Sequence, residues 1–175
     1  MINSSIWGYR ALFAGLTFAF MFFALLPFGR SDGSLPAPDI MLGLAFVWVL
    51  RRPDYVPVWL LVPLLLLADV LLMRPLGLWT LLVFLSSEYL RRRVDHSEVQ
   101  TFGAEIALVT MTIIGVFVAN HLILLLLLAE TAPLLDQALH AGATIVFYPL
   151  ITILSQWIGV RRLAPGELDS LGTRA

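Results

Sequence analysis

Six apolar runs, separated by short polar stretches, make up most of this 175-residue chain. Uncharged runs of such length are typical of transmembrane helices, which must cross a hydrocarbon layer roughly 30 Å thick. The pattern predicts an all-α integral membrane protein, a bundle of six transmembrane helices in a single domain. The expected spans are about 11–26, 35–50, 56–73, 76–90, 102–128 and 141–160, with a short cytoplasmic tail at 161–175.

The second span is the unusual one. Its regular helix, 40–50, covers only about 17 Å at 1.5 Å per residue, too little to cross the bilayer. Part of 35–38, which holds Pro36 and Pro38, must therefore enter the membrane as non-helical backbone before Asp39 caps the helix. Such backbone is tolerated at that depth only when it is buried in protein or lines a cavity, so we expect a short, broken second helix.

The composition agrees with a membrane environment. Hydrophobic residues make up 59% and charged residues 13%, about half the charged share of an ordinary soluble domain. A net charge of -1 gives no reason to expect a nucleic-acid partner, and the absence of cysteine excludes disulfides and thiolate metal sites.

The arginines indicate which side of the membrane each loop occupies, because cytoplasmic loops carry an excess of basic residues. With both termini in the cytoplasm, only Arg30 and Arg74 lie outside. The other nine, all cytoplasmic, are Arg10, Arg51, Arg52, Arg91, Arg92, Arg93, Arg161, Arg162 and Arg174. This alternation requires an even number of spans and so favours six.

Asp69 interrupts the apolar run of the third span, where a carboxylate is costly and commonly functional. It also lies near the end of its helix, where the helix dipole disfavours an anion. Its partner is then either Arg74 or the free backbone N–H groups that begin the fourth helix after Pro75. A functional role is the alternative for Asp69, whereas Asp39 is interpreted first as a helix cap.

Three further polar residues are candidates for binding or structural roles. Glu88 lies at helical spacing from Arg91 and Arg92, which predicts ion pairs. Asn120 and His121 lie in the fifth span and are expected to form hydrogen bonds between helices, or to contact a ligand or partner. The three histidines lack metal-ligand spacing, so we expect no metal, no cofactor and no catalytic residue.

Small residues recur at helical spacing on two spans. Ala11, Gly15 and Ala19 follow one another every four residues on the first span. A second set lies near one face of the fifth span: Gly103, Ala107, Gly115 and Ala119. Such faces let helices approach closely, so they predict packing within the bundle or, alternatively, docking of another protein's helix.

Three groups of residues are similar, in order and spacing, to motifs of the MreD family of bacterial rod shape-determining proteins. These are Pro38-Asp39 before a helix ending Arg51-Arg52-Pro53, Asp69 followed by Pro75-Leu76-Gly77, and Glu88-Tyr89-Leu90-Arg91. The motif positions matched are Pro38, Asp39, Asp69, Pro75, Gly77 and Glu88. The resemblance covers most of the chain and supplies no catalytic residue.

This resemblance implies a non-enzymatic scaffold in the bacterial inner membrane that supports lateral peptidoglycan synthesis and rod shape. The implied partners are MreC, most directly, then MreB, a RodA-type glycosyltransferase, a penicillin-binding transpeptidase and membrane lipids. It also implies a fold similar to the substrate-binding subunits of energy-coupling-factor transporters. The alternative function is therefore a membrane subunit that binds a vitamin or another small molecule, which would need an outward-facing cavity with convergent polar groups.

Overall fold

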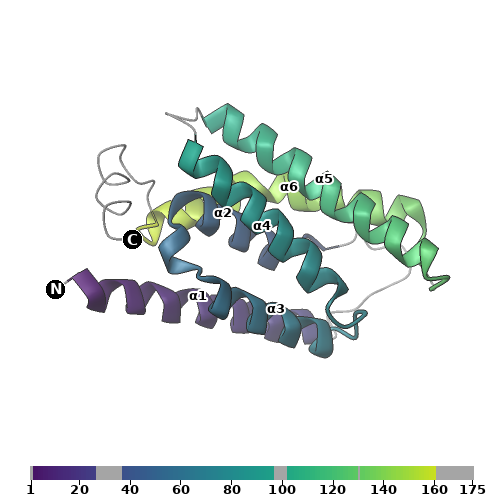
Figure 1. Cartoon of the computed structure of the whole chain (residues 1–175), viewed down its shortest axis with the longest axis horizontal. Coiled ribbons are helices and arrows are strands. Elements are labelled where there is room, and N and C mark those ends of the chain that lie inside the picture. Colours follow the sequence, from purple (N-terminus) through teal and green to yellow (C-terminus); the bar gives the residue numbers. More distant parts are fainter. Residues whose placement is uncertain (1, 27–36, 97–101, 130, 161–175) are drawn as a thin grey trace.

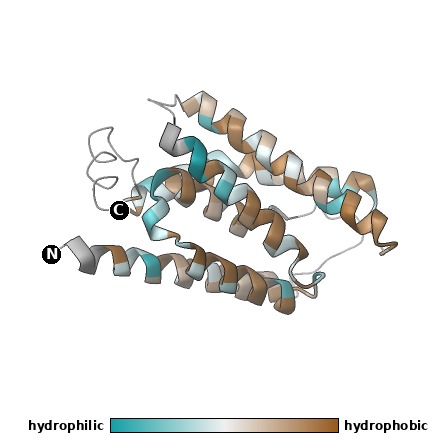
Figure 2. Ribbon diagram, in the orientation of Figure 1, coloured by the Kyte–Doolittle hydropathy of each residue, from teal (hydrophilic) through white to brown (hydrophobic). Residues whose placement is uncertain are grey.

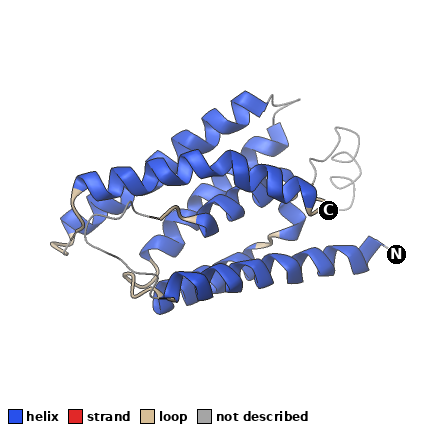
Figure 3. Ribbon diagram, turned by 180° about the vertical axis from the view of Figure 1, so that it is seen from behind, coloured by secondary structure: helices blue, strands red, loops and turns tan. Residues whose placement is uncertain are grey.

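The computed structural model describes residues 2–26, 37–96, 102–129 and 131–160, and every regular element in these ranges is helical (Figures 1 and 3). The prediction of an all-helical fold is therefore confirmed for the described residues. The elements are α1 (Ile2–Leu25), α2 (Ile40–Arg51), the 3-10 turn η1 (Pro53–Tyr55), α3 (Val58–Leu71), α4 (Leu78–His96), α5 (Phe102–Leu126) and α6 (Leu134–Trp157).

The short helix α2 forms the centre of the bundle. It contacts α1, α4, α6 and η1, and every residue from Leu42 to Arg51 is buried. A helix that is apolar on all sides belongs in an interior, because it has no polar face to present to solvent. At the centre, Trp48 is fully buried, packs on the ring of Phe13 at 5.3 Å and donates its indole N–H to the Ser155 hydroxyl.

Figure 2 shows hydrophobic residues along most of the helices around α2, and many of their large apolar side chains are exposed. Three segments are long and apolar enough to cross a membrane: Ile6–Leu25, Phe102–Leu126 and Leu134–Trp157. The helices α2 and α3 are apolar but shorter, with 12 and 14 residues. These features indicate a membrane protein, since lipid can cover an apolar exterior that water cannot.

Two helices extend beyond the boundaries that the sequence predicts. The polar residues of 129–140 predict a loop, but α6 begins at Leu134, directly after Pro133. That prediction is wrong because no residue between Leu134 and His140 breaks a helix, and polar side chains are tolerated where a helix surface is exposed. Likewise, α4 continues through its arginines to His96. Residues 35 and 36, Arg30 and the tail at 161–175 lie outside the described residues.

Replacing Trp48 tests whether α2 is the centre of the fold. Trp48→Ala leaves a cavity beside Phe13 and removes a buried hydrogen bond, so the free energy of unfolding should fall by about 3 kcal/mol or more. Thermal unfolding in mild detergent measures this. The control is Trp157→Ala, at a side chain that is 85% exposed, which should leave stability unchanged. Equal effects of the two changes would contradict the central position of α2.

Candidate functional site: polar clusters at the two ends of α2

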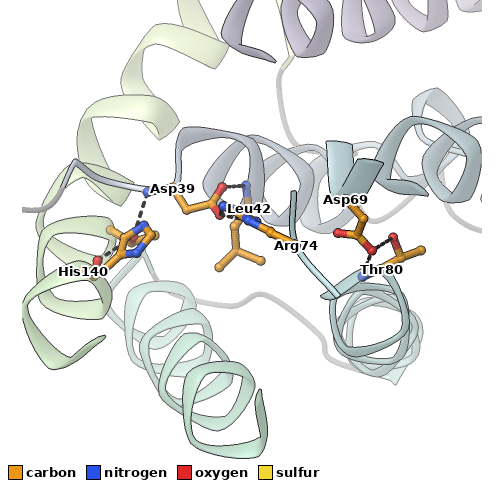
Figure 4. A network of polar contacts seen from close by, with 7 residues as sticks. Asp39, Leu42, Asp69, Arg74, Thr80 and His140 are labelled. Carbon is orange, nitrogen blue, oxygen red and sulfur yellow. Dashed lines mark hydrogen bonds and ion pairs between the residues drawn. The ribbon is translucent and has the colours of Figure 1, made fainter. Parts of the chain in front are cut away.

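Polar side chains from distant parts of the chain meet at the start of α2. Asp39 accepts the Leu42 N–H at Oδ1 (3.0 Å), as a helix N-cap does. Its Oδ2 accepts from both terminal nitrogens of Arg74, each at 3.3 Å. Its own N–H donates to the Thr144 hydroxyl (2.9 Å), which in turn donates to the His140 carbonyl (2.8 Å). Figure 4 shows these contacts, which we call the Asp39 cluster.

The Asp39 cluster also explains how non-helical backbone can precede α2. Residues 37–39 are not helical, and the Asp39 N–H would lack a partner without Thr144. Because Thr144 is fully buried on α6, this backbone donor is satisfied within the protein. The expectation of a short second helix is confirmed. Of the described residues in its non-helical entry, Asp39 is buried, Pro38 is half-buried and Ala37 is exposed, so the expected burial of this backbone holds only at Asp39.

Asp69 is fully buried and caps the next helix, α4. Its Oδ2 accepts from the Gly77 N–H (3.0 Å), the Thr80 N–H (3.3 Å) and the Thr80 hydroxyl (2.8 Å). Of the two partners predicted for Asp69, the structure therefore has the backbone N–H groups, while the guanidinium of Arg74 binds Asp39 (Figure 4). Gly77 has a φ of +83°, a conformation that glycine adopts without strain.

A row of aromatic rings in edge-on contact continues from Arg74 across the bundle. The guanidinium carbon of Arg74 lies 4.9 Å from the centre of the Trp79 ring. Trp79 then meets Phe117 edge-on at 5.3 Å, and Phe117 meets His140 at 5.2 Å. The positively charged guanidinium of Arg74 is thus stabilised by the Asp39 carboxylate and by the face of the Trp79 ring.

The sequence does not predict a second cluster, at the end of α2. Arg51 and Glu105 have side chains that are 3% and 0% exposed, with Nε and Oε1 3.5 Å apart. The Tyr148 hydroxyl donates to the same Glu105 oxygen (3.1 Å). With its amide oxygen toward Arg51, Gln156 accepts from both terminal guanidinium nitrogens at 3.0 and 2.8 Å. We call these four residues the Arg51 cluster.

Arg51 therefore corrects an expectation from the sequence. Next to Arg52 and Pro53, it resembles an arginine that anchors a helix at the membrane surface, but its side chain points into the protein. The residue that holds Arg51 there is Glu105 on α5, whose carboxylate also accepts from Tyr148 on α6. No periodic pattern within one segment reveals such a pairing, because it depends on how α2, α5 and α6 pack.

The other described arginines predicted to be cytoplasmic lie near the same end of the bundle. Arg10 donates to the carbonyl of Asp54 in η1 (3.0 Å), and Arg91 donates to the carbonyl of Val56 directly after η1 (2.8 Å). Glu88 lies 3.8 Å from Arg91 and 3.6 Å from Arg92, so the predicted ion pairs are confirmed. Figure 2 shows hydrophilic residues gathered at this end.

The remaining candidates are not brought to either cluster. Asn120 and His121 are half-buried on α5, and His121 Nδ1 is a buried atom without a hydrogen-bond partner. Of the motif prolines, Pro38 is half-buried ahead of Asp39 and Pro75 is exposed. In the described part of the chain, no group of three or more His, Cys, Asp or Glu residues is placed to bind a metal ion.

The small residues of α1 face outward. Ala11, Gly15 and Ala19 are all exposed, and nothing lies within 4 Å of the position a Cβ would take at Gly15. The interpretation that they pack within the bundle is wrong, because α1 meets its neighbours through the opposite side, at Phe13 and Met21. On α5, Gly103, Ala107 and Gly115 are likewise exposed, and Ala119 is half-buried.

A shallow apolar groove of about 340 Å³ lies between α4 and α5. Tyr89, Thr112 and Gly115 are among its lining residues. Neither Asp39 nor Asp69 reaches it. Both oxygens of the Asp39 carboxylate have partners inside the protein, and Glu105 is paired with Arg51 and Tyr148, whereas Asp69 Oδ1 is a buried atom without a hydrogen-bond partner.

Removing the cap at Asp69 tests its structural role. Asp69→Ala leaves the first N–H groups of α4 without an acceptor in a buried place, and the free energy of unfolding should fall by about 2 kcal/mol. Thermal unfolding in mild detergent measures the change. Asp136→Ala, at an exposed position in the first turn of α6, is the control and should cost only a few tenths of a kcal/mol. A stable Asp69→Ala variant would argue against the cap.

The Arg51 cluster gives a second prediction. Arg51→Met alone leaves the buried carboxylate of Glu105 without its ion-pair partner, so the free energy of unfolding should fall by about 3–5 kcal/mol. Adding Glu105→Gln should restore much of that loss, because no unpaired charge then remains and the Tyr148 hydroxyl keeps an acceptor. Arg92→Ala, which breaks an exposed ion pair, should change stability by less than about 1 kcal/mol. Additive losses in the double variant would contradict the pairing.

No family model, curated protein or solved structure matches this chain. The similarity to MreD proteins therefore depends on the motif positions themselves. Two of these, Asp39 and Asp69, are the residues that cap α2 and α4. A proposal about function therefore starts from the contacts of these residues and from the exposed helix faces.

Proposed function

We propose that this protein is a non-enzymatic scaffold of the MreD type in the bacterial inner membrane, which binds MreC and supports lateral peptidoglycan synthesis and rod shape. Through MreC it would join MreB, a RodA-type glycosyltransferase and a penicillin-binding transpeptidase. The observation that carries the proposal is the exposed small-residue face of α1, formed by Ala11, Gly15 and Ala19.

This face suits a transmembrane helix of another protein. Small side chains let two helix backbones approach closely, which is how helices associate where lipid removes the hydrophobic driving force. Large exposed side chains, Phe18 and Phe22, lie beside the small residues and could pack along the flanks of a docked helix. The single membrane helix of MreC is the partner that we propose for it.

The proposed topology has six spans with both termini in the cytoplasm, in a fold of the kind used by energy-coupling-factor substrate subunits. Arg10, Arg91 and the end of α2 lie together at one end of the bundle, and this supports a cytoplasmic location for that end. Arg74 lies at the opposite end of α2, as the alternation of loops requires.

The alternative function, a small-molecule transporter subunit, has less support. It needs polar groups that converge on a cavity. Both oxygens of Asp39 and Oδ2 of Asp69 instead accept from Arg74, Thr80 and backbone N–H groups, and Gln137 donates to the Ala132 carbonyl at the surface. The groove between α4 and α5 is mostly apolar.

A pull-down from native membranes in mild detergent, analysed by mass spectrometry, tests the proposal. The unaltered protein should recover MreC and the wall-synthesis enzymes, whereas Gly15→Leu should lower MreC recovery by about tenfold, because a large side chain separates the two helices. Gly103→Leu is the matched control, since Gly103 is also exposed with open space around it. Recovery of transporter energising subunits or a bound vitamin would instead favour the alternative.

A further inference from the structure

The helices on the different sides of the bundle differ in length. With 25 and 24 residues, α5 and α6 are each about 36 Å long, enough to cross the roughly 30 Å hydrocarbon layer. With 14 residues, α3 is only about 21 Å long. Figure 1 shows α5 and α6 extending past the turn that joins α3 to α4.

Side-chain contacts fix the depth of that turn. Arg74 in the turn and Thr144 on α6 both bind Asp39, so the turn lies within the reach of one arginine side chain from the level of Thr144. From Thr144, α6 continues ten more residues to its start at Leu134, a distance of about 15 Å. On α5, Phe117 meets Trp79 near the start of α4, and the helix then runs nine residues further, about 14 Å. Both helices therefore extend past the turn, by up to about 15 Å.

The surface of the turn is apolar where it leaves the protein. Met73 is 94% exposed and Leu76 is 72% exposed, on either side of Arg74 and Pro75. The Arg74 side chain between them turns back to Asp39 and Trp79 and is only 29% exposed. A turn in water would ordinarily present its polar side chain outward, whereas this one presents its apolar side chains.

Three backbone N–H groups of the turn are paired within the protein, which suits an apolar environment, where an unpaired N–H is costly. The Met73 and Arg74 N–H groups donate to the Val70 and Asp69 carbonyls at 3.3 and 2.9 Å. The Gly77 N–H donates to the Asp69 carboxylate at 3.0 Å. Pro75 has no N–H to satisfy. The buried carboxylate of Asp69 thus supplies an acceptor that water would otherwise provide.

We infer that the α3–α4 turn lies inside the hydrocarbon layer, in the leaflet opposite the arginine-rich end, with lipid acyl chains covering Met73 and Leu76. Lipid beside α3 and α4 must then adapt to an apolar surface that is shorter than the hydrocarbon layer is thick. Lipid beside α5 and α6 meets an apolar surface long enough to cross that layer. The protein therefore presents the bilayer with an uneven hydrophobic thickness. This inference depends on membrane insertion and not on any partner protein.

Cysteine labelling tests the depth of the turn, since the natural chain contains no cysteine. Met73→Cys and, as a second variant, Leu76→Cys are compared with Ala132→Cys, an exposed residue beyond the end of α5. Each variant is placed in nanodiscs of dioleoyl phosphatidylcholine and reacted with a membrane-impermeant maleimide. Nanodiscs leave both membrane faces accessible, and labelling after unfolding in dodecyl sulfate gives the total thiol.

We expect the thiols at 73 and 76 to react about tenfold or more slowly than the thiol at 132, because thiolate does not form in an apolar layer. Their rates should rise in thin dimyristoleoyl nanodiscs and fall further in thick dierucoyl nanodiscs, while the rate at 132 stays constant. Equal rates at all three positions, or rates at 73 and 76 that ignore bilayer thickness, would overturn the inference. If one turn variant fails to fold, the other still decides between these outcomes.

Discussion

Because α2 is buried on every side, the polar groups at both of its ends must find partners inside the protein. At one end, Asp39 caps the helix and binds Arg74, while Thr144 satisfies the backbone. At the other, Arg51 is paired with Glu105. The surrounding helices are thereby fixed in depth, since each of them except α1 contributes or adjoins one of these partners.

The two clusters stand only about 18 Å apart along α2, which is less than the thickness of a bilayer core. Charges at such depth are costly unless paired, and these are paired. The same polar groups are thus held by partners inside the protein. The surfaces that remain exposed are the small-residue face of α1 and the apolar outer faces of helices of unequal length.

Single residues illustrate how far the sequence could be interpreted. The N-cap at Asp39 and the Glu88 ion pairs were predictable because both interactions join residues within one helical turn or two. For Asp69, the sequence narrowed the partner to two candidates, and packing selected the backbone of α4. Predictions failed where the outcome depended on neighbours: Arg51 was expected at the surface, and Gly15 in an internal contact.

The sequence by itself determined the helical class, the apolar character of the segments and the short length of α2, because hydrophobicity, helix caps and helix breakers act locally. Only the tertiary structure decided that α2 is the central helix, that Arg51 meets Glu105, and that Arg74 and Thr144 both bind Asp39. These features arise from contacts between segments far apart in the chain, and every segment here is apolar enough to have packed in more than one place.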